Sequence, residues 1–260
     1  MICAGIDAGS RAVKVVLWDA QGQRVRGEGC SDQGVRQDDL AGRLLDDVLD
    51  RAGLGRSDLA CTVATGYGRN VVSAADTTVT EITCHAAGVR HVMPSARTVI
   101  EIGGQDSKLL RLADDGSVRD FAMNDRCAAG TGRFLEMVAQ RLGVALEDLG
   151  ELAGRAAQPA AISSMCVVFA ETEIISLLAA GTAPEDIVAG VQNAIASRVS
   201  GMVGRSVATP IAFTGGVALV PGMDQALTAA LNQGVEIVPR PQMTGALGAA
   251  LIAARRGGRG

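Results

Sequence analysis

The sequence predicts an α/β protein of two similar lobes, each with a mixed sheet flanked by helices. The chain has 260 residues, 48% apolar and 20% charged, which suits a folded protein with a sizeable core. Segments with strand signals alternate with segments of helical spacing. A shift of 94 positions also places Ile6–Ser10 over Ile100–Gly104. We therefore expect a duplicated fold, with lobes at 1–97 plus 240–260 and at 98–239.

Each repeat is expected to form a hairpin and a third strand, because apolar runs are bounded by glycine turns. The predicted strands are Ile2–Asp7, Ala12–Trp18 and Arg24–Glu28 in the first repeat, and Thr98–Ile102, Ser107–Leu112 and Val118–Ala122 in the second. Chance similarity between strands rich in glycine and valine is the alternative. The recurrence of a carboxylate with glycines at equivalent turns favours duplication.

Other short apolar runs predict strands at Leu59–Thr65, Ile211–Thr214 and Val235–Val238. Helical spacing predicts helices at Asp38–Ala52, Thr83–Val92, Ala128–Leu142, Ser164–Ala179, Glu185–Gly204, Met223–Leu231 and Gly245–Ala254. The last of these is rich in glycine and alanine, so we expect it to pack closely onto the first lobe. The tail Arg255–Gly260 is expected to be frayed.

Composition excludes several classes of protein. With 24 basic and 28 acidic residues the formal charge is −4, and six aromatic residues offer no stacking platform, so a nucleic-acid binder is not expected. The longest uncharged stretch, 206–223, contains Pro210 and Pro221 and cannot be one membrane-spanning helix. Asp7 and the lack of a basic start exclude a secretory signal. We expect a cytoplasmic protein without a membrane partner.

Two glycine turns have the composition of phosphate-binding loops. They are Asp7–Lys14 and Gly103–Lys108, where glycines let backbone N–H groups converge on an anion and a lysine adds charge. Asp7 and Asp106 could hold Mg²⁺ or orient an attacking water. A third turn, Thr214–Ala218, could seat a base or ribose. Each turn alone is more often a plain hairpin turn, but their conjunction favours a nucleotide site.

No P-loop or dinucleotide-binding fingerprint is present. The set of turns instead resembles the superfamily of acetate kinase, sugar kinases, Hsp70 and actin. In that superfamily two duplicated lobes hold ATP between two phosphate hairpins and an adenosine motif. The resemblance covers essentially the whole chain and implies ATP or ADP with Mg²⁺ as ligands.

Two of the six cysteines stand near predicted helix starts. Cys127 precedes the helix predicted at Ala128–Leu142, and Cys166 follows the capping residues Ser163 and Ser164. The partial positive charge of a helix N-terminus favours thiolates and an anionic cluster bound by them. A [4Fe–4S] cluster normally takes four thiolates, so two identical chains could supply the set around one cluster. A buried structural cysteine is the alternative at each position.

The other cysteines have simpler interpretations. Cys3, Cys61 and Cys84 lie in strand or helix interiors and are expected to be apolar packing residues, while Cys30 lies near a turn and is incidental. No CxxC pair occurs, and disulfides are not expected in a reducing compartment.

A closer resemblance rests on motifs spread along the chain. They are ATGYGRN at 64–70, EITCHAAG at 81–88, IEIGGQDSK at 100–108, NDRCAAGTGRFLE at 124–136, ISSMCVVFAETEIISLLAAG at 162–181, FTGGVA at 213–218 and GALGAAL at 245–251. The chain resembles the activators (component A) of 2-hydroxyacyl-CoA dehydratases. Their family includes ATPase subunits of benzoyl-CoA reductases and, more distantly, N-acetylglucosamine kinase-like ATPases.

This resemblance implies a homodimer that shares one [4Fe–4S] cluster through Cys127 and Cys166 of each chain. Ferredoxin or flavodoxin would supply an electron. ATP binding would change the angle between the cluster helices and drive that electron onto the dehydratase.

The resemblance also implies site residues. Asp7, Gln105 and Asp106 are the expected catalytic residues. The expected nucleotide contacts are Ser10, Arg11, Ala12, Val13, Lys14, Gly103, Gly104, Gln105, Thr131, Gly132, Gly215, Gly216, Val217 and Gln242.

Two departures from the family pattern bear on those contacts. Leu219-Val220-Pro221 stands where some relatives carry a polar pair, and Arg11 replaces a frequent hydroxyl residue. The two histidines, His85 and His91, are expected to be packing or helix-surface residues.

Three alternatives remain open at the level of sequence. The chain could be an ATPase subunit of an aryl-CoA reductase, a small-molecule kinase of the same fold, or an actin-like filament protein. Iron content and brown colour would separate the electron-transfer interpretations from the kinase. Sedimentation with ATP would test for a filament.

Overall fold

The computed structural model describes residues 1–163, 166–204 and 207–258, which form two compact units. Unit 1 comprises Met1–Ser95, Leu112–Arg119 and Gln242–Gly260, and unit 2 comprises Ala96–Arg111 and Asp120–Pro241. The sequence did not indicate that Leu112–Arg119, the turn of a hairpin, would group with unit 1. In the described ranges, no helix is long and apolar enough to cross a membrane.

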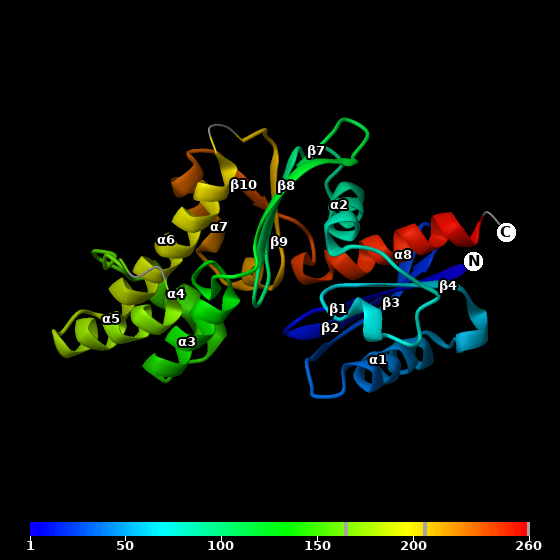
Figure 1. Ribbon diagram of the computed structural model, residues 1–260, viewed down its shortest axis with the longest axis horizontal. Helices are drawn as coiled ribbons and strands as arrows, with labels where there is room; N and C mark the ends of the chain where they lie inside the picture. The colour runs from blue at the N-terminus through cyan, green and yellow to red at the C-terminus, as the bar shows by residue number, and fades with distance from the viewer. Residues whose placement is uncertain (164–165, 205–206, 259–260) are drawn as a thin grey trace. The chain divides into compact units, whose positions relative to one another are not determined.

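Unit 1 is built on a mixed sheet with the strand order β3-β2-β1-β4-β5, of which Figure 1 labels β1 to β4. The strands are β1 (Ile2–Ala8), β2 (Ala12–Asp19), β3 (Arg24–Asp32), β4 (Leu59–Thr65) and β5 (Thr77–Thr78). β1 runs antiparallel to β2 and parallel to β4. The predicted hairpin is confirmed, although β3 continues further than expected.

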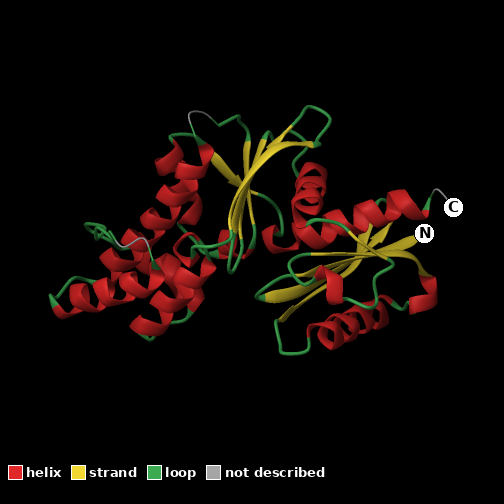
Figure 2. Ribbon diagram, viewed as in Figure 1, coloured by secondary structure: helices red, strands yellow, loops and turns green. Residues whose placement is uncertain are grey.

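Helices cover both faces of this sheet (Figure 2). Helix α1 (Gln37–Ala52) packs its Leu45 against Ile6 and Val15 on one face. Helices α2 (Glu81–Val92) and α8 (Thr244–Gly257) cover the other face, where Cys3 contributes to the same cluster as Ala249. The alternation of side chains along β1 produces this division, because successive residues of a strand point to opposite faces.

Glycines allow α8 to approach its neighbours closely, as the sequence predicted. A Cβ on Gly5 of β1 would lie 2.0 Å from Ala246 O, and one on Gly248 of α8 would lie 1.7 Å from Cys84 O in α2. Close packing of α8 onto the first sheet is therefore confirmed. The tail was expected to be frayed from Arg255 onward. This is wrong for Arg255–Gly257, which are the last residues of α8. Residues 259 and 260 lie outside the described ranges.

We expect Gly248→Val to destabilise unit 1 by more than the usual ~1–3 kcal/mol of core overpacking, since the clash is with backbone. The free energy of unfolding in urea measures this. Gly257→Ala is a matched control in the same helix, because a Cβ there meets its nearest atom at an ordinary 3.5 Å. Equal stabilities of the two variants would contradict the close α2–α8 contact.

Unit 2 repeats the sheet of unit 1, with the order β10-β9-β6-β7-β8. Its strands are β6 (Thr98–Ile102), β7 (Ser107–Leu112), β8 (Val118–Asn124), β9 (Ile211–Thr214) and β10 (Val235–Ile237). β6 is antiparallel to β7 and parallel to β9, as β1 is to β2 and β4. The duplication predicted from the 94-residue shift is therefore confirmed in topology.

One core holds the helices of unit 2 together. They are α3 (Gly132–Leu142), α4 (Leu149–Gly154), α5 (Val167–Ala179), α6 (Pro184–Val203) and α7 (Met223–Leu231). The predicted helix at Ala128–Leu142 is wrong over its first turn: Ala128–Gly130 form a 3-10 turn, and Thr131 caps α3 by accepting a hydrogen bond from Arg133 N. The predicted start of the next helix at Ser164 lies outside the described residues. The sequence did not indicate α4.

Candidate functional site

The first predicted phosphate loop is the turn between β1 and β2. Asp7 and Lys14 face each other in register across the hairpin, with Lys14 Nζ 3.6 Å from Asp7 Oδ2. Asp7 is only 5% exposed, whereas Arg11 at the tip is exposed. Val13 is buried in the core of unit 1, so its side chain is a packing residue.

Two glutamines, which the sequence analysis did not single out, hold this turn in shape. Gln33 Nε2 donates to Gly9 O at 2.8 Å, and Gln37 Nε2 donates to Ala8 O at 3.1 Å. These side chains satisfy carbonyl groups of the loop, as a turn with a fixed backbone requires.

The second predicted phosphate loop joins β6 to β7, where an ionic triad forms from buried Lys108 and Glu101 and half-buried Asp106. Lys108 Nζ donates to Glu101 Oε2 and to Asp106 Oδ2, each at 2.8 Å. Lys108 is 1% exposed, while Gln105 at the tip is exposed. The lysine therefore fixes one oxygen of Asp106.

Glu101 is a residue that the sequence analysis missed. It pairs in register with Lys108 as Asp7 pairs with Lys14, and these two lysines are the only ones in the chain. Glu101, not Asp106, is thus the counterpart of Asp7. The 94-residue shift already placed Asp7 over Glu101, so the signal was present.

The turns that follow β4 and β9 complete the internal repeat. Gly66 and Gly215 both have positive φ, at 88° and 90°. A Cβ on Gly66 would lie 2.5 Å from Asp7 Oδ1, and one on Gly215 would lie 2.8 Å from Glu101 Oε1. Each acidic side chain therefore packs against a glycine that can adopt this conformation and leaves room for the carboxylate.

The predicted site residues of unit 2 come together around Gly103 and Gly104. Gly132 N donates to Gly103 O and Arg133 N donates to Gly104 O, both at 2.9 Å. The start of α3 is thereby bonded to the phosphate loop. The Thr131 side chain is buried and donates to Ala128 O at 2.8 Å.

The predicted adenosine turn also lies in this cluster. Gly215 and Gly216 follow β9, and Gly216 is exposed. A Cβ on Gly132 would lie 3.2 Å from Val217 Cγ2, and Val217 is a core residue. Its side chain therefore serves packing, while a backbone contact of Val217 to a nucleotide stays a prediction.

Three polar side chains have a buried oxygen that lacks a hydrogen-bond partner within the described ranges. One is Thr65 Oγ1, at the end of β4; the others are Ser107 Oγ, at the start of β7, and Gln242 Oε1, in the 3-10 turn before α8. Unsatisfied buried groups are uncommon and often mark the place of a ligand or a bound water. Ser107 and Gln242 belong to segments that the sequence associates with nucleotide binding.

The two predicted cluster cysteines lie in unit 2 but not in identical settings. Cys166 is exposed and is the N-cap residue of α5. Cys127 is half-buried and precedes the 3-10 turn rather than α3 itself, because the helix is capped later by Thr131. The expectation of a shared helix-start setting is therefore wrong for Cys127.

The backbone around Cys127 is fixed, and the helices that follow the two cysteines are linked. Asn124 accepts from Cys127 N at 3.1 Å and donates to Cys127 O at 2.9 Å. α3 packs against α5, and Arg141 of α3 forms an ion pair with Glu171 of α5. In the described part of the chain, no three metal-binding side chains of the His, Cys, Asp or Glu type gather at one point.

The remaining cysteines match their packing interpretation. Cys3 and Cys84 are fully buried, and Cys61 is 9% exposed in the same cluster. Burial raises the pKa of the Cys84 thiol to about 12.

We expect Cys166 to react with a thiol reagent at pH 8 and Cys84 to react only after unfolding. The reason is that the thiolate is the reactive form and burial suppresses it at Cys84. Timed labelling of metal-free protein followed by mass spectrometry gives both rates. Rapid native-state labelling of Cys84 would contradict the packing of α2 on α8.

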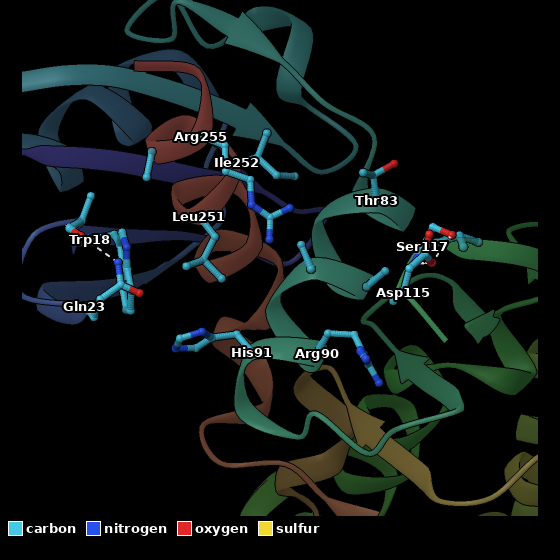
Figure 3. A pocket seen from close by; sticks show the side chains of 16 residues that line it. Trp18, Gln23, Thr83, Arg90, His91, Asp115, Ser117, Leu251, Ile252 and Arg255 are labelled. Atoms are coloured by element: carbon cyan, nitrogen blue, oxygen red, sulfur yellow. Dashed lines mark hydrogen bonds between the residues drawn. The ribbon is translucent and has the colours of Figure 1, made fainter. Parts of the chain in front are cut away.

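A cavity of about 830 Å³ in unit 1 lies apart from all these residues (Figure 3). Its wall includes Arg90, Asp115 and Arg255, and no predicted site residue lines it. His91, also in the wall, packs edge-to-face on Trp18 with ring centroids 4.9 Å apart. His91 is exposed, so it is a helix-surface residue with one ring contact, as the sequence led us to expect.

The two sheets share one topology, and each carries an acid–lysine hairpin and a glycine turn; together they define the actin-like and sugar-kinase fold. Solved structures agree on the fold. The ethanolamine utilization protein EutJ from Carboxydothermus hydrogenoformans matches with a TM-score of 0.64 at 18% identity, covering 96% of this chain and 90% of that one. The ROK hexokinase from Thermus thermophilus matches with a TM-score of 0.56 at 14% identity, and the match covers 100% of each chain.

The chain belongs to the BadF/BadG/BcrA/BcrD ATPase family, which matches residues 4–253. It is therefore an ATP-hydrolysing protein, and the family resemblance seen in the sequence is confirmed. The activator of lactoyl-CoA dehydratase from Anaerotignum propionicum is 44% identical over 258 residues, 97% of each chain. One of the subunits of benzoyl-CoA reductase from Thauera aromatica is 33% identical over 266 residues, covering 98% of this chain and 94% of that one.

A solved structure of a relative carries a nucleotide analogue. It is the activator of the 2-hydroxyisocaproyl-CoA dehydratase from Clostridium difficile with bound ADPNP. It matches with a TM-score of 0.94 at 40% identity and covers 100% of this chain and 96% of that one.

Proposed function

We propose that this protein is an ATP-dependent one-electron donor that activates a 2-hydroxyacyl-CoA dehydratase. The observation that carries the proposal is the 44% identity to a dehydratase activator over 97% of both chains. Cys127 and Cys166, on segments that lead into two packed helices, add a chemical reason, because a pure kinase has no need of such thiols.

ATP is bound through the two phosphate loops. The turn at Gly9–Arg11 and the turn at Gly103–Asp106 supply backbone donors, and Lys14 supplies a cation. Asp7 and Asp106 hold Mg²⁺ or orient the attacking water. The unsatisfied oxygens of Gln242 and Ser107 form hydrogen bonds with the nucleotide or with waters bound beside it.

Cys127 and Cys166 would hold a [4Fe–4S] cluster together with the same two residues of a second copy of the chain. The donor set fits: one thiol is exposed, the other is half-buried, and neither is in a disulfide. When bound, such a cluster accepts and releases one electron. Ferredoxin or flavodoxin is the proposed reductant, and the dehydratase receives the electron.

Hydrogen bonds within unit 2 connect the phosphate loop, where ATP is hydrolysed, to the segments that carry the two cysteines. The phosphate loop accepts from the first N–H groups of α3 through Gly103 O and Gly104 O. Cys127 is held just ahead of α3 by Asn124, and α3 is tied to α5 by Arg141 and Glu171. A change in the phosphate loop thus alters the helix start beside Cys127, which is how nucleotide state controls the electron donor.

The second candidate is the ATPase subunit of a benzoyl-CoA-type reductase, favoured by the 33% identity to a protein of that kind. An activation assay separates the two. Reduced protein with ATP and Mg²⁺ is added to an inactive 2-hydroxyacyl-CoA dehydratase, and dehydration of 2-hydroxyacyl-CoA is followed. Turnover that requires ATP supports the activator, whereas reduction of benzoyl-CoA in complex with reductase subunits, and no dehydration, overturns it.

A further inference from the structure

A buried histidine of unit 1 has no role in the proposed function as it stands. His85 lies on α2 and is 6% exposed. Its Nδ1 lies 2.9 Å from Thr244 Oγ1. Thr244 is the first residue of α8 and is 1% exposed. The imidazole therefore links α2 to the start of α8.

The same histidine and the carboxylate of Asp7 both lie against Gly245. A Cβ on Gly245, the second residue of α8, would lie 3.0 Å from Asp7 Oδ2 and 3.2 Å from His85 Nε2. On its other side Asp7 packs against Gly66, and Lys14 lies 3.6 Å away. The carboxylate thus sits in a fitted recess, one wall of which is the first turn of α8.

The position of the first turn of α8 beside Asp7 depends on the contacts between α8 and α2. The helices cross where a Cβ on Gly88 would lie 2.0 Å from Thr244 O, so they are already in backbone contact at this point. The His85–Thr244 hydrogen bond fixes the helix start next to the crossing.

We propose that His85 is a positioning residue for Asp7: it holds the first turn of α8, with Gly245, against the carboxylate and so sets the direction in which Asp7 faces the metal or water of the bound nucleotide. This inference rests on the proposed role of Asp7 in ATP hydrolysis. His85 itself does not need to touch the nucleotide.

The test compares kcat and KM for ATP hydrolysis in full-length variants. His85→Ala should lower kcat by about 10–100-fold, as a small misplacement of a catalytic group does, with KM for ATP changed by less than about 3-fold. His85→Asn, which can still hydrogen-bond to Thr244, should recover most of the loss. Thr244→Val keeps the shape, removes the hydroxyl and should behave like His85→Ala even if His85→Ala folds poorly.

His91→Ala is the control, since it removes the other histidine of the same helix, which is exposed and contacts Trp18. Its kcat should stay within about 2-fold of wild type, because His91 makes no contact with Thr244 or Asp7 that could change transition-state binding. An equal kcat loss in His91→Ala and His85→Ala would overturn the proposal.

A double-mutant cycle with Asp7→Asn shows whether His85 acts through Asp7. The combined variant should be no slower than Asp7→Asn alone, because coupled residues are not additive. Multiplied losses would overturn the positioning role of His85 while leaving the role of Asp7 intact. Unchanged hydrolysis in Asp7→Asn alone would instead reject the proposed catalytic role of Asp7, and the inference with it.

Discussion

Replacing either Cys127 or Cys166 with alanine should remove essentially all iron from anaerobically purified protein. A [4Fe–4S] cluster requires about four thiolates, and two chains lose two of them with each substitution. The wild-type protein should hold about four irons per two chains by the same rule. Iron and acid-labile sulfide analysis, with the visible absorbance of the cluster, measures the loss.

Cys30→Ala is the matched control because Cys30 is also exposed but lies in unit 1, on β3. Its iron content should equal that of the wild type. ATP binding should survive in all three variants, since none of these cysteines lies in the phosphate loops. Full iron retention in Cys127→Ala or Cys166→Ala would reject these residues as ligands.

Asp106→Asn should slow ATP hydrolysis by at least ~100-fold, the usual cost of losing a preorganised electrostatic group at the reacting phosphate. The change keeps the shape of the side chain and removes the charge that Lys108 holds at 2.8 Å. Lys14→Ala should have an effect of similar size, because it removes the cation that faces Asp7 in the first loop. Steady-state phosphate release measures both.

Asp115→Asn serves as the control for charge removal, since Asp115 lies outside the phosphate loops and accepts local hydrogen bonds from Ser117. Its hydrolysis rate should match that of the wild type. Iron content should be unchanged in every one of these variants. Normal hydrolysis in both Asp106→Asn and Lys14→Ala would mean that the two hairpins are not the phosphate site.

The sequence predicted the fold well because its signals are local and repeated. Alternating apolar residues bounded by glycine fixed the β1–β2 and β6–β7 hairpins, and the shift of 94 positions anticipated two sheets of the same order. The small residues of α8 correctly indicated close packing, since Gly248 leaves no room for a Cβ.

Features that depend on tertiary contacts were missed. Glu101 was passed over for Asp106, although the 94-residue shift aligns Glu101 with Asp7; the register with Lys108 then identifies Glu101 as the counterpart. From the sequence, His85 was expected to be a packing or helix-surface residue. Its relation to Asp7 becomes visible only in the fold, where both side chains lie against Gly245, a residue far along the chain. The late start of α3 follows from capping at Thr131 and from hydrogen bonds to the phosphate loop.

Spin counting by EPR on anaerobic, dithionite-reduced protein tests the central proposal most directly. A one-electron cluster shared by two copies predicts one unpaired electron per two chains, and a change in the signal when ATP and Mg²⁺ replace ADP. Protein that carries no iron and shows no signal, yet hydrolyses ATP or phosphorylates a sugar at a normal rate, would contradict the account.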